Sequence, residues 1–236
     1  MKNIIAFLAI CMTSAVMAQE GMNSIANNQA QAMGTASHGL ASSYGSIVSV
    51  SNPRRRTEGT FYMYDNWQNY AVIHTSDNQK FALRNINLNL QRNVFEARVE
   101  GDSIFTFNFN NIDKFIVNGV EFKNYYWNDD NRVYQVIYEG EDLQLLKGFK
   151  VDLVEGSANP MLNRANDRYV RKEYYFVREK GKISKFKLKK SKILKLVGGD
   201  EGKANEILNY ARRNKLSFSK ENDVKKILEY SSNGKN

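Results

Sequence analysis

Apolar and polar residues alternate along the stretch from Leu83 to Trp127, and this alternation is the clearest structural signal in the chain. A period of two places successive side chains on opposite faces of a strand, so the apolar set is expected to face a core. The pair Asn118-Gly119 predicts a type I′ turn, because both central residues of that turn need a positive φ angle. The inward-facing positions of the predicted hairpins hold Phe95, Phe105, Phe107, Phe109, Phe115 and Phe122.

Strand signals continue on both sides of this stretch and are separated by short turns. Short connections favour an antiparallel meander in which neighbours in sequence pair in space. Gly148, inside the longest of these strands, predicts a β-bulge. So many strands exceed what one flat sheet holds, which predicts a curled meander sheet, a sandwich or a partial barrel. The additional strands are predicted at Thr60–Tyr64, Tyr70–Thr75, Phe81–Arg84, Arg132–Tyr138, Leu143–Val154, Tyr169–Arg178 and Ile183–Lys189.

The period changes to that of amphipathic helices in the last part of the chain, residues 191–236. Three short helices are predicted, with Ser191, Asp200 and Ser219 as their N-caps and Gly198-Gly199 at the end of the first. Each helix carries one apolar stripe, so we expect the helices to pack on the sheet or on each other. The predicted fold class is therefore α+β, mainly antiparallel β followed by short C-terminal helices.

The first 18 residues are typical of a secretory signal peptide, with a basic start, an apolar run too short to span a bilayer, and the small residue Ala18 at the cleavage position. We therefore expect the mature chain to begin at Gln19. The single cysteine, Cys11, lies inside this segment, so neither a disulfide nor a thiolate metal site is expected in the mature chain. Ile10 is not the small residue that precedes the cysteine of a lipoprotein signal, which disfavours a lipid anchor.

Residues 19–56 are rich in Ser, Ala, Gly, Asn and Gln and show no regular period. Such a composition buries too little apolar area to offset the entropy of ordering the chain, which predicts a flexible tether. The expected organisation is then a signal peptide at 1–18, a flexible tether at 19–56, an antiparallel β domain at 57–190, and a basic helical segment at 191–236 that packs on the β domain.

Charge is distributed unevenly along the chain. Residues 57–167 contain 10 Lys+Arg and 16 Asp+Glu, whereas residues 168–236 contain 20 and 8. Near the start of the basic part, lysines alternate with Phe186 and Leu188, which places a row of ammonium groups outward. This row is either an edge strand protected against sheet-to-sheet aggregation or a surface for an anionic partner. The candidate binding residues are Lys185, Lys187, Lys189, Lys190, Lys192, Lys195, Arg212 and Arg213.

Motifs of known catalytic chemistry are absent from the sequence, so we expect no enzyme, no catalytic residues and no cofactor. His74 stands alone in a predicted strand, and no His/Cys cluster has metal-ligand spacing. Two acids distant in sequence can still meet in space, which leaves a carboxylate hydrolase open. Aromatic residues gather near two turns, where they either recognise a sugar or peptide or close the end of a sheet. These are Tyr62, Tyr64, Trp67, Tyr70, Tyr125, Tyr126 and Trp127.

In style, the chain resembles uncharacterised exported proteins of Bacteroidota. The resemblance is carried by the signal peptide, by the hairpins rich in Asn, Lys and Tyr, and by the closing run from Tyr174-Tyr-Phe-Val-Arg-Glu-Lys-Gly-Lys182 to Ile227-Leu-Glu-Tyr230. It covers the mature chain and contains no diagnostic motif. It implies only a location: the periplasm, the outer membrane or the outside of the cell.

The leading hypothesis is a non-enzymatic exported module that docks on an envelope protein or an anionic membrane surface. A second hypothesis is a carrier that holds a hydrophobic ligand in a curled β-sheet, in a cavity lined by the phenylalanines from Phe95 to Phe115. The third is the carboxylate hydrolase. Nucleic acid is not an expected partner, and the mature chain has no expected transmembrane helix. The sequence leaves the partner and the oligomeric state open.

Overall fold

A computed structural model of the chain describes residues 45–49, 57–99, 103–128, 130–157 and 166–233. Within these residues the fold is mainly antiparallel β, with 12 strands in open sheets followed by three short helices, which confirms the predicted fold class. The chain divides into two compact units, and the division falls inside the predicted β domain 57–190. Among the described residues, unit 1 comprises 45–49, 62–89, 94–99 and 103–119, and unit 2 comprises 57–61, 90–93, 120–128, 130–157 and 166–233.

Unit 1 contains two groups of antiparallel strands, in the orders β1-β6-β5-β4 and β7-β2-β3. The first group consists of β1 (Gly45–Ser49), β4 (Ile86–Asn89), β5 (Val94–Arg98) and β6 (Ser103–Phe107). The second consists of β2 (Tyr70–Thr75), β3 (Lys80–Arg84) and β7 (Ile112–Val117). Strand β1 pairs along its whole length with β6, although it lies in the stretch 19–56 for which the sequence predicts a tether.

The core of unit 1 is aromatic. The rings of Phe95 and Phe115 stack with their centroids 4.3 Å apart, and Phe107 meets Phe115 edge to face at 5.4 Å. Phe105 meets Phe107 in the same way at 4.8 Å. These four rings are buried, as the alternating pattern predicts, whereas Phe109 beyond the end of β6 is half-buried. The phenylalanines of unit 1 therefore fill the core largely by contacting one another.

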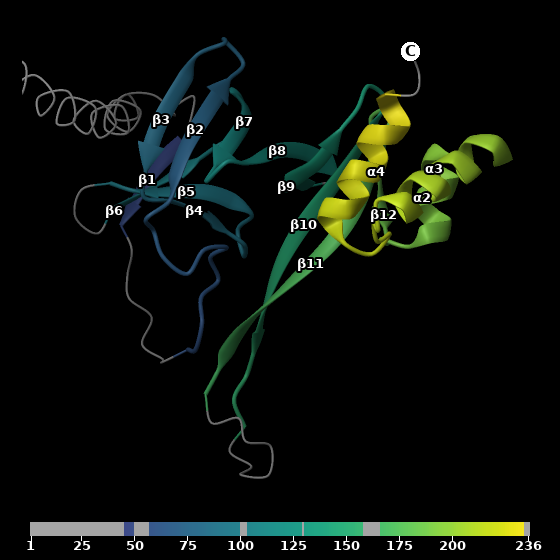
Figure 1. Cartoon of the computed structure of the whole chain (residues 1–236). Helices are drawn as coiled ribbons and strands as arrows, with labels where there is room; N and C mark the ends of the chain where they lie inside the picture. The colour runs from purple at the N-terminus through teal and green to yellow at the C-terminus, as the bar shows by residue number, and fades with distance from the viewer. Residues whose placement is uncertain (1–44, 50–56, 100–102, 129, 158–165, 234–236) are drawn as a thin grey trace, which may run out of the picture. The chain divides into compact units, whose positions relative to one another are not determined.

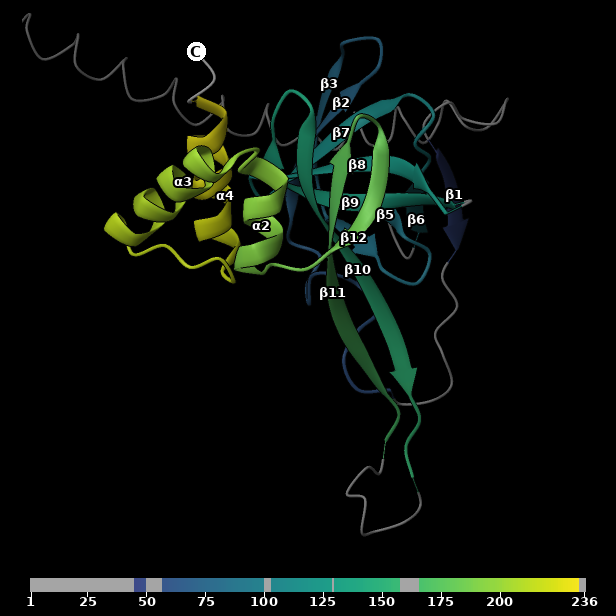
Figure 2. The ribbon, with the colours of Figure 1, turned by 90° about the vertical axis from the view of Figure 1, so that its right-hand side faces the viewer.

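Unit 2 contains an antiparallel sheet in the order β12-β11-β10-β9-β8, followed by the helices (Figures 1 and 2). Its strands are β8 (Val120–Trp127), β9 (Asp130–Glu139), β10 (Leu143–Val154), β11 (Arg168–Glu179) and β12 (Lys182–Phe186). Its helices are α2 (Lys190–Val197), α3 (Glu201–Arg213) and α4 (Glu221–Asn233). Figure 2 shows β10 and β11 as a long hairpin that extends past the other strands of this sheet.

The three helices pack against one face of the unit 2 sheet. On the sheet side, Tyr138, Leu145 and Val177 are buried in the shared core. The helices contribute their apolar stripes to this core, through Ile193, Ile207, Ala211, Val224, Ile227 and Leu228. Because single helices of this length are marginal in water, this tertiary packing is what stabilises them.

Three predictions about the strands are wrong. The strand predicted at Ile183–Lys189 ends at Phe186, where its pairing with β11 ends, and α2 begins at Lys190. The segment from Thr60 to Tyr64 is not a strand, because the amide of Asn87 bonds its backbone by accepting from Tyr64 N (3.0 Å) and donating to Tyr64 O (2.8 Å). The bulge predicted at Gly148 lies instead between Leu145 and Leu146. A Cβ atom at Gly148 would come within 2.9 Å of the ring of Phe176, so the glycine provides room for an aromatic ring.

Of the three predicted N-caps, one is correct and two are wrong. The carboxylate of Asp200 caps α3 by accepting from Lys203 N at 2.8 Å, and α2 ends at Gly198-Gly199 as predicted. Ser191 lies inside α2, whose N-cap is the extended Lys189 with no side-chain hydrogen bond. Helix α4 begins two residues after Ser219. The proposed signal peptide lies outside the described residues.

Candidate functional site

The two faces of the unit 2 sheet differ in what they carry. Residues directly opposite each other in an antiparallel pair share a face. Gly148 lies opposite Tyr134 on β9 and Tyr174 on β11, so these three share one face. Leu145, an odd number of residues away on β10, shares the other face with Val177 in the core beneath the helices. The face of Tyr134 is therefore the one opposite the helices.

A hollow of about 320 Å³ is formed at this part of the sheet. All five strands of the sheet contribute to it, and residue 93 adds one amide side chain. Aromatic side chains make much of its wall, and three cations and two amides add polar groups. The aromatic residues whose side chains share this face are Trp127, Tyr134, Tyr174 and Phe176; the cations are Arg132, Lys150 and Lys185; and the amides are Asn93 and Asn128.

The rings of Trp127, Tyr134 and Phe176 form the aromatic floor of the hollow, and ring contacts and one hydrogen bond hold this floor in place. The rings of Trp127 and Tyr134 both contact the Phe176 ring edge to face, with centroid distances of 5.4 Å and 5.2 Å respectively. The indole Nε1–H of Trp127 donates to the backbone oxygen of Ile183 on the edge strand at 3.0 Å. Gly148 leaves space for the rings of Phe176 and Tyr134. Contacts within the protein therefore fix the positions of these rings.

The three cations of the hollow come from three different strands. The guanidinium of Arg132 lies 5.9 Å from the ring centroid of Trp127 and 3.4 Å from Asp130, in an exposed ion pair. The ammonium of Lys150 lies 2.7 Å from Asp152. Lys185 lies opposite Phe176 in the register and is exposed. No acid belongs to the lining among the described residues, but Asp130 and Asp152 pair with two of the three cations, which leaves Lys185 as the lining cation without an ion-pair partner in the described chain.

Tyr134 is the buried polar residue of this hollow. Its side chain is 1% exposed, and its hydroxyl has no hydrogen-bond partner within the described part of the chain. Burial raises the pKa of Tyr134 to about 12, with Arg132 acting in the opposite direction and Asp130 in the same direction. An unpaired buried hydroxyl costs free energy, because its hydrogen bonds to water are lost on folding.

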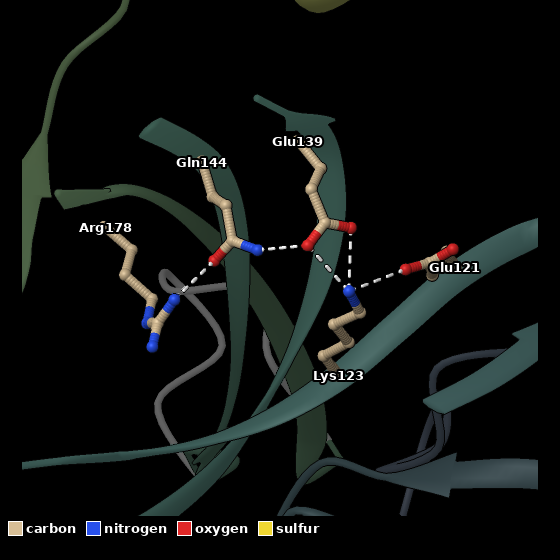
Figure 3. A network of polar contacts seen from close by, with 5 residues as sticks. All are labelled: Glu121, Lys123, Glu139, Gln144 and Arg178. Carbon is tan, nitrogen blue, oxygen red and sulfur yellow. Dashed lines mark hydrogen bonds and ion pairs between the residues drawn. The ribbon is translucent and has the colours of Figure 1, made fainter. Parts of the chain in front are cut away.

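A network of polar contacts links β8, β9, β10 and β11 (Figure 3). The ammonium of Lys123 donates to both carboxylate oxygens of Glu139 at 2.7 Å and lies 3.3 Å from Glu121. Gln144 donates to Glu139 and accepts from Arg178 at 3.2 Å. Burial lowers the pKa of Lys123, but the hydrogen bond and the charge of Glu139 outweigh burial and leave that pKa above its ordinary value.

This network supports the aromatic floor. The Arg178 guanidinium lies 4.8 Å from the ring centroid of Tyr125, and that ring lies 6.2 Å from Tyr134. Burial raises the pKa of Tyr125. Because the amide of Gln144 connects Arg178 to the Lys123–Glu139 pair, the position of Tyr125 depends on side chains from four strands. We interpret the network as structural support for Tyr134 rather than as a reactive centre.

The predicted cationic residues fall into two groups. Lys185 lies on β12, which is the edge strand of the unit 2 sheet, and the neighbouring lysines follow it through the link and along α2; all six are exposed. Arg212 and Arg213 lie in the last turn of α3, which leads away from α2 and β12 in both views (Figures 1 and 2). The lysine row, as we call the first group, consists of Lys185, Lys187, Lys189, Lys190, Lys192 and Lys195.

The lysine row differs from other basic residues of unit 2 in its pairing. Lys123, Lys147 and Lys172 each lie within 3.0 Å of a carboxylate oxygen. Among the described residues, no acid lies within ion-pair distance of any lysine of the row. Phe186 and Leu188, which alternate with these lysines, pack against the core beneath the helices. The predicted alternation of inward rings and outward ammonium groups is therefore present.

The aromatic residues near the first of the two turns belong to unit 1, where two of them contact one another and strand β5. The rings of Tyr62 and Trp67 meet at 4.7 Å, and the Arg98 guanidinium lies 4.7 Å from the Trp67 ring centroid. The Tyr62 hydroxyl donates to the buried carboxylate of Glu96 at 2.7 Å. These contacts attach the segment to β5, which matches the interpretation that aromatics close the end of a sheet. Tyr70 is exposed at the start of β2.

Among the described residues of unit 2, acids converge at two places, and in both a lysine lies between them. Lys123 contacts Glu121 and Glu139, and Lys147 lies 3.0 Å from both Glu173 and Glu221. An ammonium that bonds both carboxylates joins the elements that carry them. The geometry is that of an ion-pair network, so it gives the hydrolase hypothesis no specific support.

His74 is half-buried on β2, with Lys80 and Lys114 as its cross-strand neighbours. The described residues contain no group of three His, Asp or Glu side chains arranged to hold a metal ion. No helix in the described part of the chain is long and apolar enough to cross a membrane. No known protein family model matches this chain, and neither a curated protein nor a solved structure shows a significant match.

Proposed function

We propose that the protein is a non-enzymatic exported module that docks on an anionic surface of the cell envelope. The lysine row is the observation that carries this proposal. Six exposed ammonium groups follow one another over β12, the link and α2, and no carboxylate of the described chain neutralises them. Their charges add to a local positive potential that attracts polyanions.

The position of the row suits surface contact. Lys192 and Lys195 lie three residues apart on α2, so they share a side of the helix, while Ile193 between them is buried against the sheet. The side chains can therefore reach a partner without disturbing the core. Phosphate or carboxylate groups at the surface of a membrane or an envelope protein supply the complementary charge.

The edge-strand interpretation is the competing explanation for the same residues. Lysine on an edge strand discourages pairing with another sheet, and Lys185 does lie on the edge strand β12. Strand β12 ends at Phe186, however, so the remaining five lysines lie in the link and on α2. Edge protection therefore accounts for only the first residue of the row.

Charge reversal of the row tests the proposal. We expect the variant with Lys187, Lys189, Lys190, Lys192 and Lys195 all changed to Glu to lose sedimentation with anionic liposomes while keeping its circular dichroism spectrum. Wild-type binding should weaken between about 0.05 and 0.5 M salt, because the screening length falls to a few ångströms. Lys185 is kept, because it also lines the hollow.

A matched control separates position from net charge. Changing five other exposed lysines to Glu alters the net charge equally; these are Lys180, Lys182, Lys215, Lys220 and Lys226. We expect this control to keep most of the binding. Equal binding by wild type and the row variant, or equal loss in both variants, would contradict docking through the row.

The hydrophobic carrier is not favoured by the core of unit 1. That hypothesis needs a cavity lined by the phenylalanines, whereas Phe95, Phe107 and Phe115 contact one another at centroid distances of 4.3 and 5.4 Å. A ligand between these rings would have to separate them and break contacts that stabilise the unit.

A further inference from the structure

We infer that the hollow on the unit 2 sheet binds an anionic sugar unit, such as the acid-bearing end of a polysaccharide. The hollow shares Lys185 with the lysine row but none of the other five lysines, and the inference goes beyond the proposed docking function. Its volume of about 320 Å³ is at the lower end of the range of about 300–1,000 Å³ that small-molecule sites occupy. The hollow therefore suits one small unit rather than an extended chain.

The aromatic wall offers a flat apolar surface. Tyr174 is 42% exposed, and Trp127 is half-buried. One face of a sugar ring presents mainly C–H groups, while its hydroxyls lie around the ring, so it packs against an aromatic plane and keeps its hydroxyls available for polar partners. The amide side chains of Asn93 and Asn128 can both donate to and accept from such hydroxyls.

The cations select for a negative charge. Arg132, Lys150 and Lys185 line the hollow, and the lining contains no acid among the described residues. Arg132 presents a planar fork of donors that matches the two oxygens of a carboxylate or phosphate. Lys185 has no ion-pair partner in the described chain, so a ligand need not displace a carboxylate from it. A neutral sugar would leave this charge uncompensated.

The site is organised before any ligand binds. The bond from Trp127 Nε1 to Ile183, the contacts of Trp127 and Tyr134 with Phe176, and the absence of a side chain at Gly148 fix the floor. A rigid site loses little entropy on binding, which favours affinity for a small ligand. Tyr134 adds a buried hydroxyl whose hydrogen-bonding capacity is unused by the described chain.

The experiment follows the two indole N–H signals of the mature protein by NMR during titration with glucuronic acid, glucose 6-phosphate, glucose or inorganic phosphate. The chain has two tryptophans, so Trp67 of unit 1 is an internal reference for Trp127. We expect both anionic sugars to shift the Trp127 signal, and glucose and phosphate alone to bind at least about tenfold more weakly. The stronger of the two anionic sugars identifies carboxylate or phosphate as the preferred group.

Two variants and two controls locate the binding. Tyr174→Ala and Lys185→Glu each change one exposed lining residue and should weaken binding at least about tenfold. Tyr126→Ala and Lys187→Glu change neighbouring exposed residues outside the lining and should bind as wild type does. No shift of Trp127 with either anionic sugar, equal affinity for glucose, equal affinity for phosphate alone, or equal loss in variants and controls would overturn the inference.

Discussion

At the scale of single residues, Tyr134 and Tyr62 place their hydroxyls in opposite situations. The Tyr62 hydroxyl donates to the buried carboxylate of Glu96 at 2.7 Å, whereas the Tyr134 hydroxyl is buried with no partner among the described residues. A hydrogen bond to a charged group contributes about 1.5–3 kcal/mol to stability, while an unpaired buried hydroxyl costs about 1–3 kcal/mol. The same chemical change at the two tyrosines should therefore have opposite effects.

We expect Tyr134→Phe to leave the free energy of unfolding unchanged or to raise it by up to about 2 kcal/mol, because it removes the unpaired hydroxyl and keeps the ring. Tyr62→Phe, the matched control, should lower it by about 1–3 kcal/mol. Urea denaturation measures both. A loss of more than about 1 kcal/mol in Tyr134→Phe would show that its hydroxyl has a partner.

The pH dependence of the same variant gives a second readout. Burial raises the pKa of Tyr134 from 10.0 to about 12 in the folded chain, so the folded state retains this proton over a range where the unfolded state releases it. Stability from this group is complete below pH 10 and is lost as the pH rises from about 10 to about 12. We expect the alkaline loss of stability to be smaller in Tyr134→Phe, and an identical loss in both proteins would contradict the assignment.

At the scale of elements, local signals predicted the turns and strands whose geometry is encoded by adjacent residues. Asn118 and Gly119 have φ angles of 51° and 80°, the positive values that the type I′ turn requires. The strand Leu143–Val154 has the predicted bounds. The pattern failed at Thr60–Tyr64, because this segment meets β4 through one isolated bridge, Tyr62 with Asn89, and the distant Asn87 side chain bonds the backbone of Tyr64 where a ladder would continue. Contacts between segments far apart in sequence decide such cases.

The hollow was not predictable for the same reason. Its residues run from Asn93 to Lys185 and come together only through the register of β8 to β12. The sequence singled out Trp127 and Lys185 for separate reasons, and it gave no sign that Tyr134, Gly148 and Tyr174 lie side by side. That neighbourhood depends on the pairing of Gly148 with both tyrosines, together with a bulge whose position was predicted wrongly.

Lys147 is the residue through which helix α4 is joined to the sheet by charge. Its ammonium lies 3.0 Å from Glu173 on β11 and 3.0 Å from Glu221 in the first turn of α4, and its side chain is 13% exposed. Burial lowers the pKa of Lys147, but hydrogen bonds to these two acids outweigh burial and leave it raised. The Tyr175 hydroxyl also lies 3.2 Å from Glu221.

We expect Lys147→Ala to lower the free energy of unfolding by about 1–3 kcal/mol, because it leaves the partly buried carboxylate of Glu221 without this donor and breaks its link to Glu173. Lys172→Ala is the matched control on the same sheet, since Lys172 pairs with Asp152 at 2.8 Å but is half exposed. Its loss should stay below about 1 kcal/mol. Chemical denaturation followed by Trp127 fluorescence measures both, and equal losses would contradict the role of Lys147 in joining α4 to the sheet.

At the scale of the whole molecule, each unit has a core of different chemistry. Unit 1 packs phenylalanine rings against one another, whereas unit 2 buries the aliphatic stripes of three helices on its sheet. Each unit also contains one of the two tryptophans, Trp67 in unit 1 and Trp127 in unit 2. Fluorescence can therefore follow the two cores separately when the other tryptophan is replaced by phenylalanine.

We expect core truncations to act mainly on the unit that contains them. Phe107→Ala should cost about 3–5 kcal/mol and lower the denaturation midpoint reported by Trp67, because the Phe107 ring contacts both Phe105 and Phe115. Ile227→Ala should cost about 2–5 kcal/mol and lower the midpoint reported by Trp127, because Ile227 is fully buried in the helix-covered core.

Asn108→Ala, beside Phe107 in sequence and only half-buried, should shift neither midpoint by much, which controls for a change at that place in the chain. If either truncation moved both tryptophan midpoints by the same amount, the two cores would unfold as one cooperative system. The division into units would then describe packing but not stability. If Phe107→Ala lowered the Trp67 midpoint more than the Trp127 midpoint, and Ile227→Ala did the reverse, each core would be shown to be stabilised chiefly by its own side chains.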